Sequence, residues 1–167
     1  TGDAKYADTM ELVIYNSGLS GISADGRDFC YMNPLRWYGP EQEMLSHDTP
    51  SRWFTHNCYC CPPQVTREIA WMQNWAYGIS DEGLWCHIYG GSAVDLELPD
   101  GAELKLKQTT DYPWDGEVKL TIASAPDRIW SLFLRIPGWA AGAEVEVNGE
   151  TAASPPVPGE YLRIERR

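Results

Sequence analysis

The N-terminal part of the chain carries apolar side chains at the spacing of an amphipathic helix. Asp3 stands just before them and is a good N-cap residue, so it predicts where the helix begins. Gly18 and Gly21 then weaken the pattern and predict its end. The side chains expected to share the buried face of this helix are those of Tyr6, Met10, Val13, Ile14 and Ser17.

A second helix is predicted to begin at Pro62 and Pro63. Proline is tolerated in the first helical turn, because the backbone there needs no hydrogen-bond donor. Gly78 is expected to end this helix. Residues 35–57, which precede it, show no clear period and are predicted to form a loop. The buried stripe expected for the second helix consists of Val65, Ile69, Met72 and Ala76.

Beyond residue 83 the pattern changes to the two-residue period of β-strands. Short runs alternate apolar and polar residues or are apolar throughout, as in "LWCHIYG", "AVDLELP", "ELKLKQTTDYPW", "EVKLTIA" and "IWSLFLRIPGW". Asn148-Gly149 is the strongest short-range hairpin signal. Several short strands at regular spacing are typical of an antiparallel β-sandwich. We therefore predict an α+β chain with a helical part at residues 1–83 and a β-sandwich at residues 84–167.

Composition and charge narrow the class of ligand. The chain has 167 residues and a net charge of -11, which disfavours nucleic acid and anionic membrane surfaces as partners, since both are bound by Lys and Arg clusters. A neutral substrate fits better. Eight Trp and nine Tyr also suit sugars, because sugar C–H groups pack on aromatic faces.

The chain contains five cysteines, an odd number that does not indicate a disulfide framework. Metal-binding or catalytic thiols in a reducing compartment are the simpler explanation, and we therefore expect a cytoplasmic location. The chain has no initiating Met and stops inside a predicted strand, "YLRIERR", so we expect it to be a piece of a longer protein. That longer protein could carry an export signal outside this sequence.

Cys60 and Cys61 directly precede the second helix, where the helix dipole favours thiolates. Two neighbouring thiolates repel each other unless a cation lies between them, and zinc binds thiolates at about 2.3 Å. Asp25 and Gly26 predict a turn between two short extended pieces. The second piece carries Asp28 and Cys30, whose side chains would point to the same side of a strand. Together with Cys60 and Cys61, they are our predicted zinc ligands; the alternative is that the cysteines only fill a crowded turn.

Five segments in this order resemble glycoside hydrolase family 127, the β-L-arabinofuranosidases: "GDAKYAD…MELVIYN", "FCYMNPL", "CYCCPPQVTREIA", "TDYPWDG" and "LRIPGWA". The resemblance spans most of the chain. It implies the last helices and the zinc loop of an (α/α)6 barrel, followed by a β-sandwich. It also implies a retaining glycosidase that binds Zn²⁺ and releases terminal L-arabinofuranose or a related furanoside.

The resemblance also implies roles for single residues. Cys60, bound to zinc, would be the nucleophile, and Glu11 would be the acid/base. Cys30, Cys61 and Asp28 would be the other zinc ligands. The sequence departs from the family at Asp28, where Glu is usual, and at Gln64, where Asn follows "CCPP". The loop between Cys30 and Cys60 is also short.

Two other functions stay open at this point. One is a non-catalytic carbohydrate-binding piece whose zinc is purely structural, and the other is a redox protein that uses Cys58 and Cys60. His56, two residues before the cysteines, either contacts substrate or orients the loop. Homodimer formation is left open. We expect the isolated chain to be inactive, because half of the presumed barrel would be missing.

Overall fold

The computed structural model describes residues 2–30, 52 and 60–167 of the chain. These residues form two compact units, one of Thr1–Thr9 with Gln73–Arg167 and one of Met10–Met72. The predicted loop at residues 35–57 lies outside the described residues except for Arg52. No helix in the described part of the chain is long and apolar enough to span a membrane.

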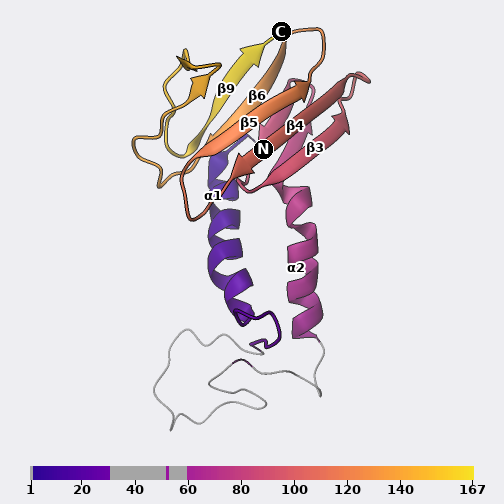
Figure 1. The fold of residues 1–167 in the computed structure, drawn as a ribbon, viewed down its shortest axis with the longest axis vertical. Helices are drawn as coiled ribbons and strands as arrows, with labels where there is room; N and C mark the ends of the chain where they lie inside the picture. The colour runs from indigo at the N-terminus through magenta and orange to yellow at the C-terminus, as the bar shows by residue number, and fades with distance from the viewer. Residues whose placement is uncertain (1, 31–51, 53–59) are drawn as a thin grey trace. The chain divides into compact units, whose positions relative to one another are not determined.

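The larger unit is built from β-sheets, labelled in Figure 1. One sheet has the strand order β1-β2-β6-β9, a second has the order β3-β4-β5, and β7 and β8 form a separate pair. The strands are β1 (Tyr77–Ser80), β2 (Gly83–Cys86), β3 (Ser92–Glu97), β4 (Glu103–Thr110), β5 (Val118–Ser124), β6 (Trp130–Ile136), β7 (Glu146–Val147), β8 (Glu150–Thr151) and β9 (Glu160–Arg166). The predicted α+β class is confirmed, and strand β1 begins ahead of the predicted domain boundary.

The two larger sheets share one hydrophobic core. Leu84 of β2, Leu104 of β4 and Leu132 of β6 are all buried in it. A polar contact also joins the sheets, because the Tyr77 hydroxyl on β1 lies 2.8 Å from Gln108 Nε2 on β4. Apolar side chains on the inner faces of both sheets are thereby removed from water, which is the main source of stability for such a sandwich.

One strand pairing differs from the prediction. All strands were expected to be antiparallel, but β2 and β6 run parallel, with Gly83 opposite Ser131. Gly83 has a φ of 147°, and a side chain there would collide with the carbonyl oxygen of Ser131. The parallel pairing therefore requires glycine at this position. Periodicity within a strand carries no information on the direction of its partner, so this feature was not visible in the sequence pattern.

The predicted turns are confirmed. Asn148 and Gly149 connect β7 to β8 and both have positive φ, 56° and 83°, as a type I′ turn requires. In the "TDYPWD" segment, the backbone N–H of Trp114 donates to the carbonyl of Asp111 at 2.9 Å. The Asp115 carboxylate then accepts from the N–H of Glu117 at 2.9 Å. Asp111 and Asp115 thus build a turn between β4 and β5, as suits a residue type that favours turns.

Helix α1 (Ala4–Leu12) begins as predicted, but of the side chains expected in its buried face only Ile14 is fully buried. The side chain of Asp3 caps it by accepting from the N–H of Lys5 at 3.1 Å. Tyr6, which we expected in the buried face, is 59% exposed. The buried positions are Ala4, Ala7, Glu11, Ile14 and Gly18. Their alternating spacing of three and four residues is helical, but four of the five are small or charged and carry little hydrophobic signal.

The smaller unit contains the end of α1, a π-helix (Val13–Gly18), a 3-10 turn (Leu19–Gly21) and most of helix α2 (Cys61–Ala76). Helix α2 starts next to Pro62 and Pro63 as predicted, but it ends at Ala76, and Gly78 belongs to β1. The expected buried stripe is wrong: no residue of α2 is buried, and Ile69 is 45% exposed. Val65, Met72 and Ala76 are half-buried, so the apolar face of α2 is only partly covered by the part of the chain that the structure describes.

Candidate functional site

Glu11 lies in the last turn of α1 and is almost completely buried, with 6% of its surface exposed. Its neighbours on the buried side of the helix, Ala7 and Ile14, are apolar. A carboxyl group in such surroundings is unusual, because burying a charge costs free energy unless a partner compensates it. Glu11 is therefore not an ordinary solvated helix carboxylate.

The helix widens directly after Glu11. Residues Val13–Gly18 form a π-helix, in which the Ser17 hydroxyl donates to the carbonyl of Val13 at 3.1 Å. Asn16 Nδ2 donates to the carbonyl of Leu12 at 2.9 Å. Such one-turn π segments within helices occur frequently at functional sites. The widened turn thus adds to the reasons for regarding Glu11 as a functional residue.

Asp28 and Cys30 lie on one arm of a short hairpin. Its two arms meet at a bridge between Ile22 and Phe29. The N–H of Cys30 donates to the carbonyl of Gly21 at 2.9 Å, and the N–H of Asp28 donates to the Ser23 hydroxyl at 2.9 Å. Asp28 and Cys30 therefore flank the bridge residue Phe29 on this arm of the hairpin.

The turn of this hairpin forms at the predicted Asp25-Gly26 pair. Gly26 has a φ of 72°, and its N–H donates to the carbonyl of Ser23 at 2.9 Å. The Ser23 hydroxyl, followed by the backbone N–H of Arg27, lowers the pKa of Asp25 below its ordinary value. An ionised Asp25 therefore helps to hold the turn that precedes Asp28.

Cys60 and Cys61 stand at the start of α2 with their sulfur atoms 3.6 Å apart. This separation is far longer than the S–S bond of a disulfide, about 2.05 Å. Cys60 is exposed and Cys61 is half-buried. Cys60 is therefore open to solvent at the N-terminus of α2.

The four predicted zinc ligands all fall within the described residues, but the structure does not gather them into one cluster. Among those residues, no group of three or more His, Cys, Asp and Glu side chains is close enough to hold a metal ion. Of the four predicted ligands, the structure brings together the sulfurs of Cys60 and Cys61. The full ligand set thus stays a prediction, and the predicted contact residue His56 lies outside the described residues.

The remaining cysteine and histidine of the β-sandwich are structural. Cys86 is fully buried, and burial raises the pKa of its thiol to about 12. His87 Nδ1 lies 2.6 Å from the hydroxyl of Tyr161. Burial, followed by the nearby charge of Arg135, lowers the pKa of His87. Cys86 therefore lacks the properties of a nucleophile, and His87 is engaged by Tyr161 within the sandwich.

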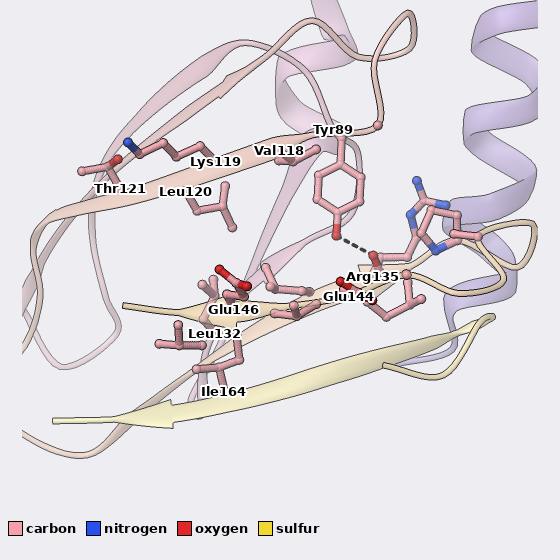
Figure 2. Close-up of a pocket in the computed structure, with 18 of the residues that line it drawn as sticks. Tyr89, Val118, Lys119, Leu120, Thr121, Leu132, Arg135, Glu144, Glu146 and Ile164 are labelled. Carbon is pink, nitrogen blue, oxygen red and sulfur yellow. Dashed lines mark hydrogen bonds between the residues drawn. The ribbon is translucent and has the colours of Figure 1, made fainter. Parts of the chain in front are cut away.

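A cavity of about 900 Å³ opens inside the β-sandwich (Figure 2). Leu120 of β5, Leu132 of β6 and Ile164 of β9 line it, and none of the predicted site residues does. Leu132 also belongs to the hydrophobic core. The cavity is therefore an open part of the space between the sheets, and it does not bring together groups for catalysis.

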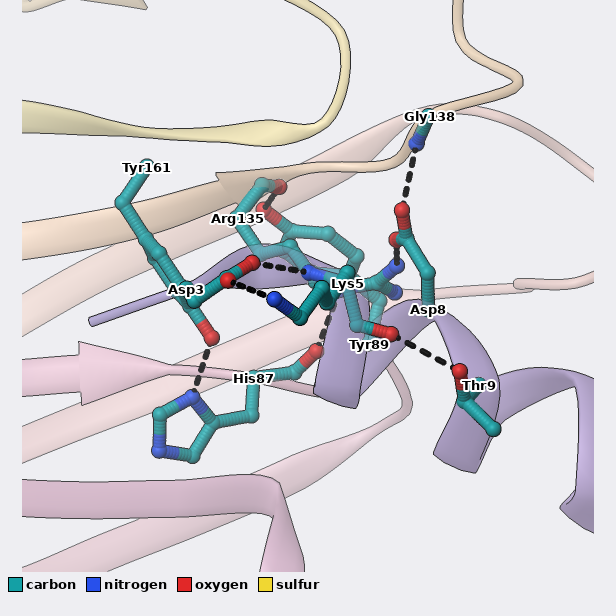
Figure 3. A network of polar contacts seen from close by, with 9 residues as sticks. All are labelled: Asp3, Lys5, Asp8, Thr9, His87, Tyr89, Arg135, Gly138 and Tyr161. Carbon is teal, nitrogen blue, oxygen red and sulfur yellow. Dashed lines mark hydrogen bonds and ion pairs between the residues drawn. The ribbon is translucent and has the colours of Figure 1, made fainter. Parts of the chain in front are cut away.

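Two charged groups were missed by the sequence analysis. Glu68 on α2 lies against Gly18, where any side chain would collide with its carboxylate. Arg135 on β6 is fully buried and forms an ion pair with Asp8 of α1 at 2.5 Å (Figure 3). No local pattern could have revealed either contact, since each joins residues far apart in the sequence.

Comparisons with known proteins match both parts of the chain. Residues 1–74 match the family model described as the β-L-arabinofuranosidase GH127 catalytic domain, and residues 83–167 match the model for the GH127 middle domain. A non-reducing end β-L-arabinofuranosidase from Bifidobacterium longum is 35% identical over 158 residues, which are 89% of this chain and 23% of that protein.

Solved structures agree with these matches. A GH127 β-L-arabinofuranosidase from Geobacillus stearothermophilus T6 superposes with a TM-score of 0.84 at 42% identity, over 98% of this chain and 26% of that one. A structure named as a glycoside hydrolase gives a TM-score of 0.90 at 40% identity, over 99% of this chain and 27% of that one. The chain thus spans about a quarter of the length of the relatives it matches.

Proposed function

Since the chain belongs to glycoside hydrolase family 127, we propose that the full-length protein is a retaining glycosidase that releases terminal L-arabinofuranose or a related furanoside. Helices α1 and α2 would be the last helices of its (α/α)6 barrel. The relatives are named β-L-arabinofuranosidases, which supports L-arabinofuranose as the sugar released. The observation that carries the catalytic assignment is the pair of adjacent sulfurs of Cys60 and Cys61 at the start of α2.

The sulfur pair fits a zinc ion. Two sulfur ligands of a tetrahedral zinc, each at about 2.3 Å from the metal, lie roughly 3.8 Å from one another. The Cys60 and Cys61 sulfurs are 3.6 Å apart, close to that value without any rearrangement. Cys30 and Asp28 would complete the ligand set. When bound, zinc would keep a thiolate ionised at neutral pH and stabilise sulfur as a leaving group.

Cys60 and Glu11 would share the chemistry of a retaining hydrolysis. The Cys60 sulfur would attack the anomeric carbon while Glu11 protonates the departing glycosidic oxygen, which yields a sugar bound covalently to Cys60. Glu11 would then take a proton from water, which attacks the same carbon and releases the thiolate. Cys60 supports this role by its exposure at the start of α2, and Glu11 by its buried position at the end of α1.

The test is Cys60→Ala in the full-length protein, assayed with 4-nitrophenyl β-L-arabinofuranoside. We expect turnover to be lost while the circular dichroism spectrum and the melting temperature are retained. Cys86→Ala is the matched control, since it removes a thiol from the sandwich core and should keep turnover. Near-normal activity of Cys60→Ala would refute the assignment of Cys60 as the nucleophile.

Zinc analysis of the unsubstituted protein separates the competing functions. One zinc per chain with turnover supports the glycosidase. One zinc per chain without any turnover would instead favour a binding module with a structural metal site.

A further inference from the structure

The 3-10 turn Leu19–Gly21 ends the N-terminal helical run and is bonded to two other segments of the smaller compact unit. The Gly21 carbonyl accepts from the N–H of Cys30 at 2.9 Å. The Ser20 carbonyl accepts from the side chain of Arg52, which lies 32 residues further along the chain. The turn thus links the predicted zinc ligand Cys30 to a distant arginine.

The contact from Arg52 uses two donors. Its Nε donates to the Ser20 carbonyl at 3.0 Å, and its Nη2 donates to the same oxygen. A guanidinium presents its donors in a rigid fork, so it restrains the direction of the carbonyl as well as its distance. A cation is also favoured at this place, because the last carbonyls of a helical run lack partners within the helix. Arg52 therefore holds the planar peptide group between Ser20 and Gly21.

The hairpin that carries Asp28 and Cys30 leaves the helical run directly after this peptide group. The N–H of Ser23 donates to the carbonyl of Asp28 at 2.8 Å, and Ile22 is bridged to Phe29. These bonds tie the two arms of the hairpin to each other, so that it moves as one piece. The backbone torsions just before it therefore decide where both predicted ligands of this hairpin lie.

Gly21 is the point at which that direction can change most easily. Glycine has the widest choice of backbone conformation, so the peptide groups on its two sides rotate freely unless contacts hold them. Arg52 holds the first of these groups, and the N–H of Cys30 binds the carbonyl of the second. Loss of the Arg52 side chain would free the first group and loosen the direction of the hairpin.

Gly21 also neighbours helix α2, which begins at the cysteine pair. A Cβ placed on Gly21 would lie 3.8 Å from Val65 Cγ2, an ordinary contact distance. Val65 follows Cys61 by four residues, and the two are half-buried on the same face of the helix. A change in direction at Gly21 would therefore alter the separation between Cys30 and the cysteine pair.

We propose that Arg52 is a positioning residue for the zinc site. By holding the Ser20 carbonyl, it sets the direction in which the hairpin with Asp28 and Cys30 leaves the helical run. The inference rests on the proposed function, because it requires Cys30 to bind zinc together with the cysteine pair of α2. In this role Arg52 contacts neither the metal nor the sugar.

The test measures zinc affinity in the full-length protein, by competition with a chromogenic chelator. The variants are Arg52→Ala, Arg52→Lys and Arg27→Ala. Arg27 is the matched control, since it is exposed in the same unit and bonds to Ser23 and Asp25 through its backbone N–H. Arg27→Ala therefore removes the same charge and keeps these bonds. Melting temperatures of the metal-free variants show whether each one is folded.

We expect Arg52→Ala to weaken zinc binding about tenfold, the lower end of the range for groups that support metal ligands. The melting temperature of the metal-free protein should change little. Arg52→Lys should bind zinc with intermediate affinity, since Lys keeps the charge but not the fork. Arg27→Ala should bind zinc as tightly as the unsubstituted protein. At saturating Co²⁺, Arg52→Ala should show weaker thiolate-to-metal absorption, because Cys30 is then less well placed to bind.

Gly21→Ala tests the route through the turn. Gly21 has helical backbone, which alanine adopts readily and with less freedom than glycine. Added to Arg52→Ala, it should therefore recover about two- to fivefold of the lost zinc affinity. A purely electrostatic effect of Arg52 would give no such recovery.

Unchanged zinc affinity in Arg52→Ala, or an equal loss in Arg27→Ala, would overturn the positioning role while leaving the proposed function intact. A double variant that binds zinc no more tightly than Arg52→Ala would refute the route through Gly21. Absence of zinc from the unsubstituted protein would instead refute the zinc site of the proposed function, and the inference with it.

Discussion

The ion pair between Asp8 and Arg135 makes a quantitative prediction about stability. Replacing Asp8 with Ala leaves the Arg135 guanidinium, which is 0% exposed, without the Asp8 carboxylate. Removing one partner of a buried ion pair typically costs about 3–5 kcal/mol. We therefore expect Asp8→Ala to lower the free energy of unfolding by about 3–5 kcal/mol.

The reverse substitution should cost less. The Asp8 side chain keeps 27% of its surface exposed, so after Arg135→Met water can solvate the carboxylate. Only charged hydrogen bonds are then lost, at about 1.5–3 kcal/mol. The double variant Asp8→Ala/Arg135→Met should be more stable than Asp8→Ala alone, because Met fills the space without a charge.

Urea unfolding of the chain and its variants, followed by tryptophan fluorescence, measures these differences. Trp85 is a suitable reporter because it stacks on Phe133 with the ring centroids 3.8 Å apart. A free energy of unfolding for Asp8→Ala within about 1 kcal/mol of that of the unsubstituted chain would show that the ion pair does not contribute as a buried pair should. A double variant no more stable than Asp8→Ala would show that the loss of stability does not come from burying the Arg135 guanidinium without the Asp8 carboxylate.

Four further predictions can be tested, three from single positions and one from the length of the chain. Burial lowers the pKa of His87 below its ordinary value of 6.5, so the unfolded state takes up a proton first, and the free energy of unfolding should decrease as the pH falls below about 6.5; His87→Gln should reduce that decrease in urea titrations at pH 5 to 7. Gly83→Ala should destabilise the chain by more than about 1 kcal/mol in the same assay, since its backbone conformation and the neighbouring carbonyl both exclude a side chain. In metal-free folded protein, iodoacetamide should modify exposed Cys60 quickly and Cys86 only after unfolding, and equal rates by peptide mass spectrometry would contradict this. The isolated chain should not hydrolyse 4-nitrophenyl β-L-arabinofuranoside, because it spans about a quarter of its relatives' length, and robust turnover would contradict that expectation.

The sequence predicted most of the secondary structure correctly because the signals were local. Asp3 caps α1, and Asn148-Gly149 forms the hairpin turn, since both depend on the conformational preferences of a few adjacent residues. The family resemblance was also local, because it rested on short motifs, and the comparisons bear it out.

The buried face of α1 could not be read in the same way. Hydrophobicity favoured Tyr6 and Val13, but the helix buries Ala7, Glu11 and Gly18. Small residues permit close approach of another segment, and a buried carboxyl group reduces the hydrophobic signal of the face it lies on. Glu11, the residue of greatest chemical interest on this helix, is therefore one reason why the hydrophobic pattern did not reveal the buried face.

Taken alone, the amino-acid sequence determined where helices, strands and turns form, and it placed two cysteines beside each other at a helix start. Adjacent residues decide these features through backbone preferences and side-chain size. Only the tertiary structure decided that β2 and β6 run parallel and that Arg135 meets Asp8, since these contacts depend on how distant segments pack. Their energies come from burial and charge pairing, which exist only once the chain has folded.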